Sequence, residues 1–123
     1  MHTQLGPGLL EGVYGAILAR ALEEKGFRVE RERGISFEFD GMRFVDACRV
    51  DLLNEGCVVV ELKSVERLAP VHAKQVLTYL RLLDLPIGLL VNFGAARLKD
   101  GLQRIVNDRS PLAEAAIVAT RQL

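Results

Sequence analysis

The chain has 123 residues, with sixteen acidic and sixteen basic side chains and a hydrophobic fraction of 50%. This length fits one domain around one core, and the balanced charge lacks the basic excess that strong nonspecific nucleic-acid binding normally requires. No apolar run approaches the ~20 residues of a membrane span, and no signal peptide is visible. We therefore expect a single cytoplasmic domain with no membrane partner. In that compartment Cys48 and Cys57 are expected to be reduced core thiols.

The first predicted element is a helix over residues 7–25. Pro7 suits a first helical turn, where its missing N–H is not needed. Gly26 is a natural stop. Apolar residues recur at helical spacing and predict one buried stripe, made of Leu9, Leu10, Val13, Ile17, Leu18, Ala21 and Leu22.

Extended segments follow this helix. Polar and apolar residues alternate over residues 27–32 and again over residues 35–39, which is typical of a strand with one buried face. Asp40 and Gly41 form a strong hairpin signal. The returning strand is predicted over residues 42–53.

A second turn over residues 54–56 leads into the valine-rich segment 57–63, which indicates a central, buried strand. Pro70 then opens a second helix that reaches residue 83, and another apolar strand covers residues 87–93. The buried side of that helix is predicted to consist of Val71, Val76, Leu77, Leu80 and Leu83.

The last part of the chain reads as helical. A short helix is predicted over residues 100–106, and Ser110 and Pro111 look like the cap and first turn of a final apolar helix. The coarse order is therefore α-β-β-β-α-β in one domain over residues 1–123, with residues 107–123 as a helical extension. We expect an α/β fold with a mixed sheet flanked by helices, because consecutive strands with tight turns pair antiparallel and a helical crossover brings in a parallel neighbour.

The end of the valine-rich strand carries the most informative residues. Glu61 and Lys63 are two apart and point to the same side of a strand, whereas Leu62 points to the other. Asp51 is the acidic residue of the preceding strand that the hairpin can bring beside them.

The turn decides whether Asp51 shares that face. If the loop is the three residues 54–56, with Gly56 left-handed, Leu53 lies opposite Cys57 and Asp51 lies opposite Val59. Asp51 is then a diagonal neighbour of the glutamate on the same face. A loop longer by one residue would break this parity.

Two carboxylates and a main-chain carbonyl, here that of Leu62, form a hard oxygen site that suits Mg²⁺ or Mn²⁺. Such an ion lowers the pKa of a bound water and neutralises charge at a phosphate. Lys63 beside it would orient the water or stabilise the developing charge. The alternative is a plain salt bridge at a strand end, which spacing alone favours. The free-energy cost of burying carboxylates at the end of a valine-rich strand argues against a plain salt bridge.

Two further pairs bear on this site. Gln75 and Tyr79 lie four apart and share a face of the second helix. Taken without the neighbouring motifs, the pair is equally well interpreted as a surface glutamine and a half-buried tyrosine. Glu11 lies early in the first helix, with Tyr14 one turn later. An acidic residue there is usually a partner of the helix dipole.

Together these residues resemble a known family, the GxxExxY proteins of the PD-(D/E)XK nuclease superfamily. The resemblance covers roughly residues 2–106, and several motifs occur in the right order. The motifs are Gly8-Leu9-Leu10-Glu11-Gly12-Val13-Tyr14, Arg49-Val50-Asp51-Leu52-Leu53, Val60-Glu61-Leu62-Lys63 and Gly88-Leu89-Leu90-Val91-Asn92-Phe93-Gly94. The stretch Leu5-Gly6-Pro7, directly before the first motif, also resembles the family.

The resemblance implies an αβββαβ core. It also implies that Asp51 and Glu61 are metal ligands and that Lys63 is the catalytic lysine. Glu11 matches the acidic residue that some members add to the metal shell. The QxxxY motif of RecB-like nucleases is matched by Gln75 and Tyr79. One departure is Gly15, because members of the family often carry an acidic residue after the tyrosine.

The leading hypothesis is a Mg²⁺- or Mn²⁺-dependent nuclease that hydrolyses phosphodiester bonds, with DNA favoured over RNA. The alternative is a catalytically silent nuclease fold used for binding or assembly, which the small size and zero net charge favour. A homodimer would bury the apolar tail helix.

Several other polar residues are candidates for smaller roles. His72, at the start of the second helix, either faces a phosphate or simply faces solvent, and Asn92 is expected to satisfy backbone groups near its strand end. The cationic side chains that could contact phosphates are Arg67, Lys74, Arg97, Lys99 and Arg104.

Overall fold

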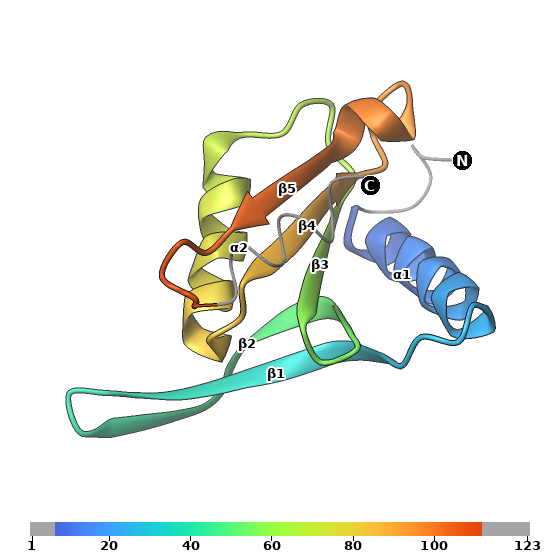
Figure 1. Cartoon of the computed structure of the whole chain (residues 1–123). Coiled ribbons are helices and arrows are strands. Elements are labelled where there is room, and N and C mark those ends of the chain that lie inside the picture. The colour runs from blue at the N-terminus through green and yellow to red at the C-terminus, as the bar shows by residue number, and fades with distance from the viewer. Residues whose placement is uncertain (1–6, 112–123) are drawn as a thin grey trace.

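The computed structural model describes residues 7–111 of the chain, and the expected tail helix therefore lies almost entirely outside the described residues. Two helices and five strands make up this part (Figure 1). In chain order the elements are α1 (Pro7–Glu24), β1 (Val29–Phe39), β2 (Met42–Asn54), β3 (Val58–Lys63), α2 (Pro70–Leu83), β4 (Ile87–Asn92), the 3₁₀ helix η1 (Leu98–Gly101) and β5 (Leu102–Val106).

The five strands form one mixed sheet in the order β1-β2-β3-β4-β5. Strands β3 and β4 are parallel, as the crossover through α2 requires, and the other neighbours are antiparallel. Helices α1 and α2 lie on opposite sides of the sheet (Figure 1). The predicted α/β architecture, a mixed sheet flanked by helices with an αβββαβ core, is confirmed. Neither helix is long and apolar enough to cross a bilayer within residues 7–111.

The short helix predicted over residues 100–106 is wrong. That segment is the last residues of η1 followed by strand β5, which pairs antiparallel with β4. Without β5, the open backbone edge of β4 would need another partner. Ile105 also places its side chain in the core, at 8% exposure. A tertiary pairing thus overrides the local pattern.

Strands β1 and β2 form one long hairpin, in which β1 is continuous where the alternation indicated two segments and β2 has nearly its predicted bounds. Strand β1 begins at Val29, and Phe27 lies before it, 41% exposed. The far half of the hairpin extends well beyond the rest of the sheet (Figure 1). Phe37 and Phe44 stack across its two strands, with ring centroids 5.2 Å apart, which stabilises their pairing, and Phe37 also packs against the apolar cluster that contains residues of α2.

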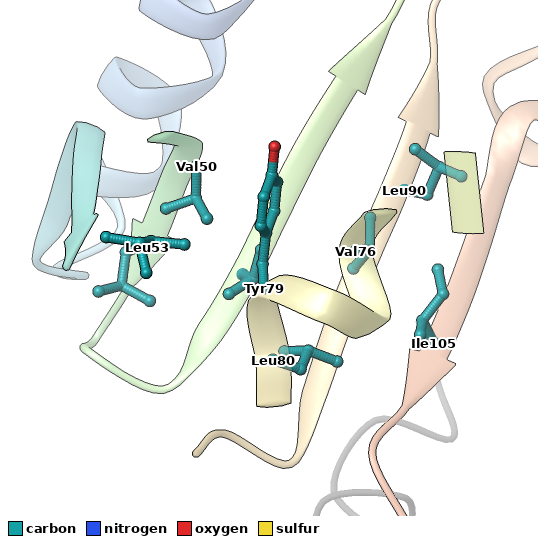
Figure 2. Packing of buried hydrophobic residues seen from close by; sticks show 9 residues of the cluster. Val50, Leu53, Val76, Tyr79, Leu80, Leu90 and Ile105 are labelled. Carbon is teal, nitrogen blue, oxygen red and sulfur yellow. The ribbon is translucent and has the colours of Figure 1, made fainter. Parts of the chain in front are cut away.

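Two apolar clusters fill the two sides of the sheet. On the side of α2, Val76, Tyr79 and Leu80 pack against strand residues (Figure 2). On the side of α1, Ala19 packs against residues of β2, β3 and β4. The predicted stripes are partly wrong, because several members are exposed: Val13 at 38%, Ile17 at 60% and Val71 at 63%. Val71 lies in the first turn of α2, where it borders an open groove instead of the sheet.

Gly88 allows α2 to approach β4 closely. A Cβ at this position would lie 2.7 Å from Val76 Cγ1 and 3.3 Å from the carbonyl oxygen of Val59. We expect Gly88→Ala to lower the free energy of unfolding by about 1–3 kcal/mol, as other overpacked cores do. Gly12→Ala is the matched control, since a Cβ on that helical residue meets nothing within 4 Å and should stabilise the protein by up to ~1 kcal/mol. Urea unfolding of both variants measures the difference, and equal stability of the two would contradict this account of the packing.

Candidate active site

The turn between β2 and β3 is a three-residue loop, as predicted, but it lies one residue further along the chain. It comprises Glu55, Gly56 and Cys57, and the first two have left-handed φ values of 55° and 67°. Leu53 therefore pairs with Val59 and not with Cys57, which is exposed. The register differs from the predicted one by two residues. A shift of two preserves the side to which each residue points, and Glu61 and Lys63 accordingly lie on the α2 side with Val59.

Strand β2 changes face at Asp51. Val50 and Leu53 belong to the cluster on the α2 side, whereas Leu52 belongs to the cluster on the α1 side. Strict alternation would place Val50 with Leu52. Across the hairpin, Glu32 lies between the residues that pair with Val50 and Leu52, and it has a left-handed φ of 51°. This irregularity places Asp51 at the point where β2 diverges from β3.

Side chains replace the regular ladder at this point. The last regular pair is Leu52 with Val60. Beyond it, the N–H of Asp51 donates to Glu61 Oε1 at 2.8 Å, and the N–H of Leu62 donates to Asp51 Oδ2 at 2.7 Å. The carboxylate of Glu61, on β3, therefore accepts a hydrogen bond from β2, and the carboxylate of Asp51, on β2, accepts one from β3. The two acids are held side by side around the last residues of β3, with one oxygen of each committed to the backbone.

This pairing is electrostatically costly without a cation. Glu61 is 3% exposed. The pKa of its carboxyl group is raised to about 8, mainly by burial and next by the negative charge of Asp51, while the positive charge of Lys63 opposes these effects. The cause is ordinary: a desolvated carboxylate beside a second carboxylate is disfavoured in its charged form. A positive ion at this position would relieve the repulsion.

Helix α1 brings Glu11 and Tyr14 to the same end of β3. The N–H of Ser64 donates to Glu11 Oε2 at 3.2 Å. Tyr14 stacks on Phe93, with ring centroids 4.1 Å apart. Glu11 also lines a small cavity of about 100 Å³ together with Asp51, so the acid of the first helix and the acid of β2 face one space.

Gly15 allows this docking, because a Cβ there would lie only 3.2 Å from Leu62 Cδ1.

Helix α2 supplies the other wall. Gln75 Nε2 donates to the Tyr79 hydroxyl at 2.9 Å. Tyr79 is 8% exposed, and its hydroxyl points along β3 toward the carboxyl end of the strand (Figure 2). Burial raises the pKa of Tyr79, and the charge of Glu61 raises it further. Lys63 and Gln75 line one open groove on this side. The structure thus brings Glu61, Lys63 and the Gln75–Tyr79 pair to the same side of the sheet.

Asn92 holds the segment that follows Lys63. Its Oδ1 accepts from the N–H groups of Val65 and Gly94, both at 3.0 Å, and its Nδ2 donates to the Val65 carbonyl oxygen at 2.8 Å. The expectation that Asn92 satisfies nearby backbone groups is confirmed.

Two further residues line the α1-side cavity, Arg31 and Glu32, and neither was expected from the sequence. Arg31 Nη2 donates to the carbonyl oxygen of Gly12 at 3.3 Å, which links the hairpin to α1. No motif indicated either residue, and they reach the cavity only because β1 and β2 are irregular opposite each other.

The expected ligand residues are not gathered into one compact group. Within residues 7–111, no three His, Cys, Asp or Glu side chains lie close enough together to form a ready-made metal-binding group. Glu11 and Asp51 share the cavity on the α1 side, while Glu61 binds Asp51 from the α2 side. The donors are hard carboxylate oxygens whose negative charges repel each other when both acids are ionised, and these properties suit Mg²⁺ or Mn²⁺. The residues therefore fit a divalent ion in their chemistry.

Comparison with known proteins supports the fold. The described chain is similar to a solved structure described as "Crystal structure of SSO0001", with a TM-score of 0.57 and 18% sequence identity. The match covers 94% of this chain but 61% of that one, so this chain spans about three fifths of the other protein's length. No curated protein matches the sequence.

A family model described as the PD-(D/E)XK nuclease superfamily matches residues 1–105, which is most of the sequence. The fold described above has the αβββαβ core that this assignment implies. The chain belongs to the PD-(D/E)XK nuclease superfamily.

Proposed function

We propose that this protein is a metal-dependent nuclease that hydrolyses phosphodiester bonds, with DNA favoured over RNA, and that it is a GxxExxY member of its superfamily. The observation that carries the proposal is the interlocked pair of Asp51 and Glu61, followed two residues later by Lys63. PD-(D/E)XK nucleases usually use divalent metals, and this chain places two acids where their mutual repulsion calls for a cation.

In this proposal Glu11, Asp51, Glu61 and the carbonyl oxygen of Leu62 hold Mg²⁺ or Mn²⁺. The ion supplies an activated water and neutralises charge on the phosphate. The two backbone bonds that join the acids keep both carboxylates in place before any ligand arrives. Because the pair is preorganised, little of the free energy of metal binding is lost in ordering its side chains.

Lys63 is the catalytic cation of the proposal. Its ammonium group would orient the attacking water and stabilise the negative charge that develops on the phosphoryl oxygens. Lys63 follows Glu61 by two residues on β3 and so lies on the same side of the sheet, and its positive charge opposes the rise in the pKa of Glu61. Gln75 and Tyr79 would support the site from α2, since their hydrogen bond fixes the direction of the hydroxyl group.

Metal binding by Asp51 tests this proposal without an activity assay. We expect wild-type protein to bind Mn²⁺ in a calorimetric titration and Asp51→Asn to lose at least about tenfold in affinity, because one anionic ligand is removed. Asp40→Asn is the matched control: it changes the same group at the exposed hairpin turn, where φ is 52°, a conformation that asparagine adopts readily. A wild-type protein that is folded but binds no Mn²⁺ and cuts neither DNA nor RNA would overturn the proposal.

The second candidate is a nuclease fold that binds or assembles without turnover. The observation that favours it is the far half of the β1–β2 hairpin, where large apolar side chains are exposed: Phe39 at 68%, Met42 at 54% and Val45 at 67%. Such a surface is typical of a protein interface, and a homodimer is one way to cover it. Metal binding with cleavage supports the first candidate; a folded protein that self-associates through the hairpin and has neither property supports the second.

A further inference from the structure

The open groove beside Lys63 has a distinct chemical character. Its volume is about 530 Å³, and it lies between the end of β3 and the outer side of α2. No acidic residue is among the side chains that line it, which are Lys63, Val71, His72, Lys74, Gln75 and Thr78. The cavity on the α1 side is mainly acidic, because Glu11, Glu32 and Asp51 line it together with one cation, Arg31. The two sides of β3 therefore differ in the sign of charge that they offer to a ligand.

His72 is held as a hydrogen-bond donor toward its surroundings. Its Nδ1 accepts the N–H of the N-cap residue Ala69 at 2.9 Å, which is the one half of a capping box that an alanine N-cap allows. Because Nδ1 accepts this bond, the ring proton must be on Nε2. Nε2 is therefore a donor, and His72 can bind an anion in this state without gaining a proton.

Apart from the side-chain oxygen of Gln75, the neighbouring polar groups are also donors or are already hydrogen-bonded. Lys63 and Lys74 carry ammonium groups, which can only donate. The hydroxyl of Thr78 donates to the Lys74 carbonyl oxygen at 3.0 Å, and Gln75 Nε2 is oriented by Tyr79. A groove with this composition selects an anion with several acceptor oxygens, and a phosphate diester is such a group.

We infer that this groove binds a backbone phosphate of the nucleic-acid strand beside the scissile one, with His72 and Lys74 as contact residues. The inference rests on the proposed function and extends it by one subsite. The strand leaves the acidic centre past Lys63 and continues over the outer side of α2. Contacts to phosphates carry no base information, so the groove positions the strand without selecting its sequence.

Binding of a fluorescently labelled short DNA, single-stranded and duplex, tests this inference. Fluorescence anisotropy would be measured over a range of salt concentrations, with Ca²⁺ in place of Mg²⁺ to limit cleavage. We expect Lys74→Glu and His72→Glu each to weaken binding by about tenfold and to reduce the salt slope by about one. Lys25→Glu, an equal charge reversal at an exposed residue after α1, is the control and should bind as wild type does.

His72 has a second role in the cap, and two variants separate the roles. Glutamate and glutamine are the usual residues at this position of a capping box, so both His72→Glu and His72→Gln should keep the thermal stability of wild type. Only glutamine retains an N–H donor, and His72→Gln should bind DNA within about threefold of wild type. Equal loss of binding in both variants would contradict the phosphate contact.

The outcomes distinguish this inference from the proposed function. If wild-type protein cleaves DNA while Lys74→Glu and His72→Glu bind with wild-type affinity and salt slope, the subsite is wrong and the nuclease assignment stands. If charge reversal weakens binding as expected but no nucleic acid is cleaved with Mg²⁺ or Mn²⁺, the subsite stands and the nuclease assignment fails. A wild-type protein that binds neither DNA probe overturns the subsite.

Discussion

Replacement of Lys63 by alanine should lower the rate of phosphodiester cleavage by about a hundredfold to a thousandfold, with the fold retained. An electrostatic contact to developing charge is typically worth two to three orders of magnitude in rate, roughly 3–4 kcal/mol. Lys63 is only half-buried and lines an open groove, so its truncation leaves no unpaired group in the core. We therefore expect the loss in rate without a comparable loss in thermal stability.

Single-turnover cleavage at saturating protein gives the rate of the chemical step directly. Lys74→Ala is the matched control, because it removes the same ammonium group from the same groove at a position that we assign to binding. It should weaken the affinity and leave the single-turnover rate within about threefold of wild type. Cleavage by Lys63→Ala at the wild-type rate would remove the lysine from the mechanism, and with it the main reason for assigning catalysis to this site.

The metal-free protein should lose stability as the pH rises from about 5 to about 8, and Glu61 should be the main cause. The pKa of Glu61 is raised from 4.5 to about 8 by burial and by Asp51. Between these values the folded protein holds a proton that the unfolded chain has released. Stability then falls with rising pH, because it falls wherever the folded state binds more protons. The total change is on the order of a few kcal/mol.

Glu61→Gln keeps the shape of the side chain but cannot ionise, and its free energy of unfolding should change far less over this pH range. Chemical denaturation at a series of pH values in EDTA gives the comparison. Glu38→Gln, on the exposed hairpin with a side chain 70% exposed, is the matched control and should follow wild type. Added Mn²⁺ should stabilise wild type more at pH 8 than at pH 5, because the ion and the proton compete for the same carboxylates. A Glu61→Gln profile as steep as wild type would refute this origin of the pH dependence.

The amino-acid sequence predicted the helices α1 and α2, the strands β2 to β4, β1 as two segments, and the turns, of which the one before β3 lies one residue further along the chain. These features depend on residues that are near in sequence: apolar spacing, Pro7 and Pro70 at helix starts, and glycines at turns. The same short-range information placed Glu61 and Lys63 on one face, since alternation along a straight strand is local. It also placed Gln75 and Tyr79 on one face of α2, where they are hydrogen-bonded. Membership of the nuclease superfamily was likewise readable from motif order, and the family match confirms it.

The site itself depended on contacts between distant residues. Strand β5 forms because β4 offers it an edge, although the local pattern of residues 100–106 favoured a helix. The change of face at Asp51 accompanies the left-handed Glu32 on the neighbouring strand, and no periodicity within β2 indicates it. Glu11 reaches the end of β3 through the N–H of Ser64, 53 residues later in the chain. Local patterns specify which segments are helices and strands because backbone preferences act over a few residues. Which carboxylates meet was decided by the packing of α1 and the hairpin against β3, because only packing brings together groups so far apart in the sequence.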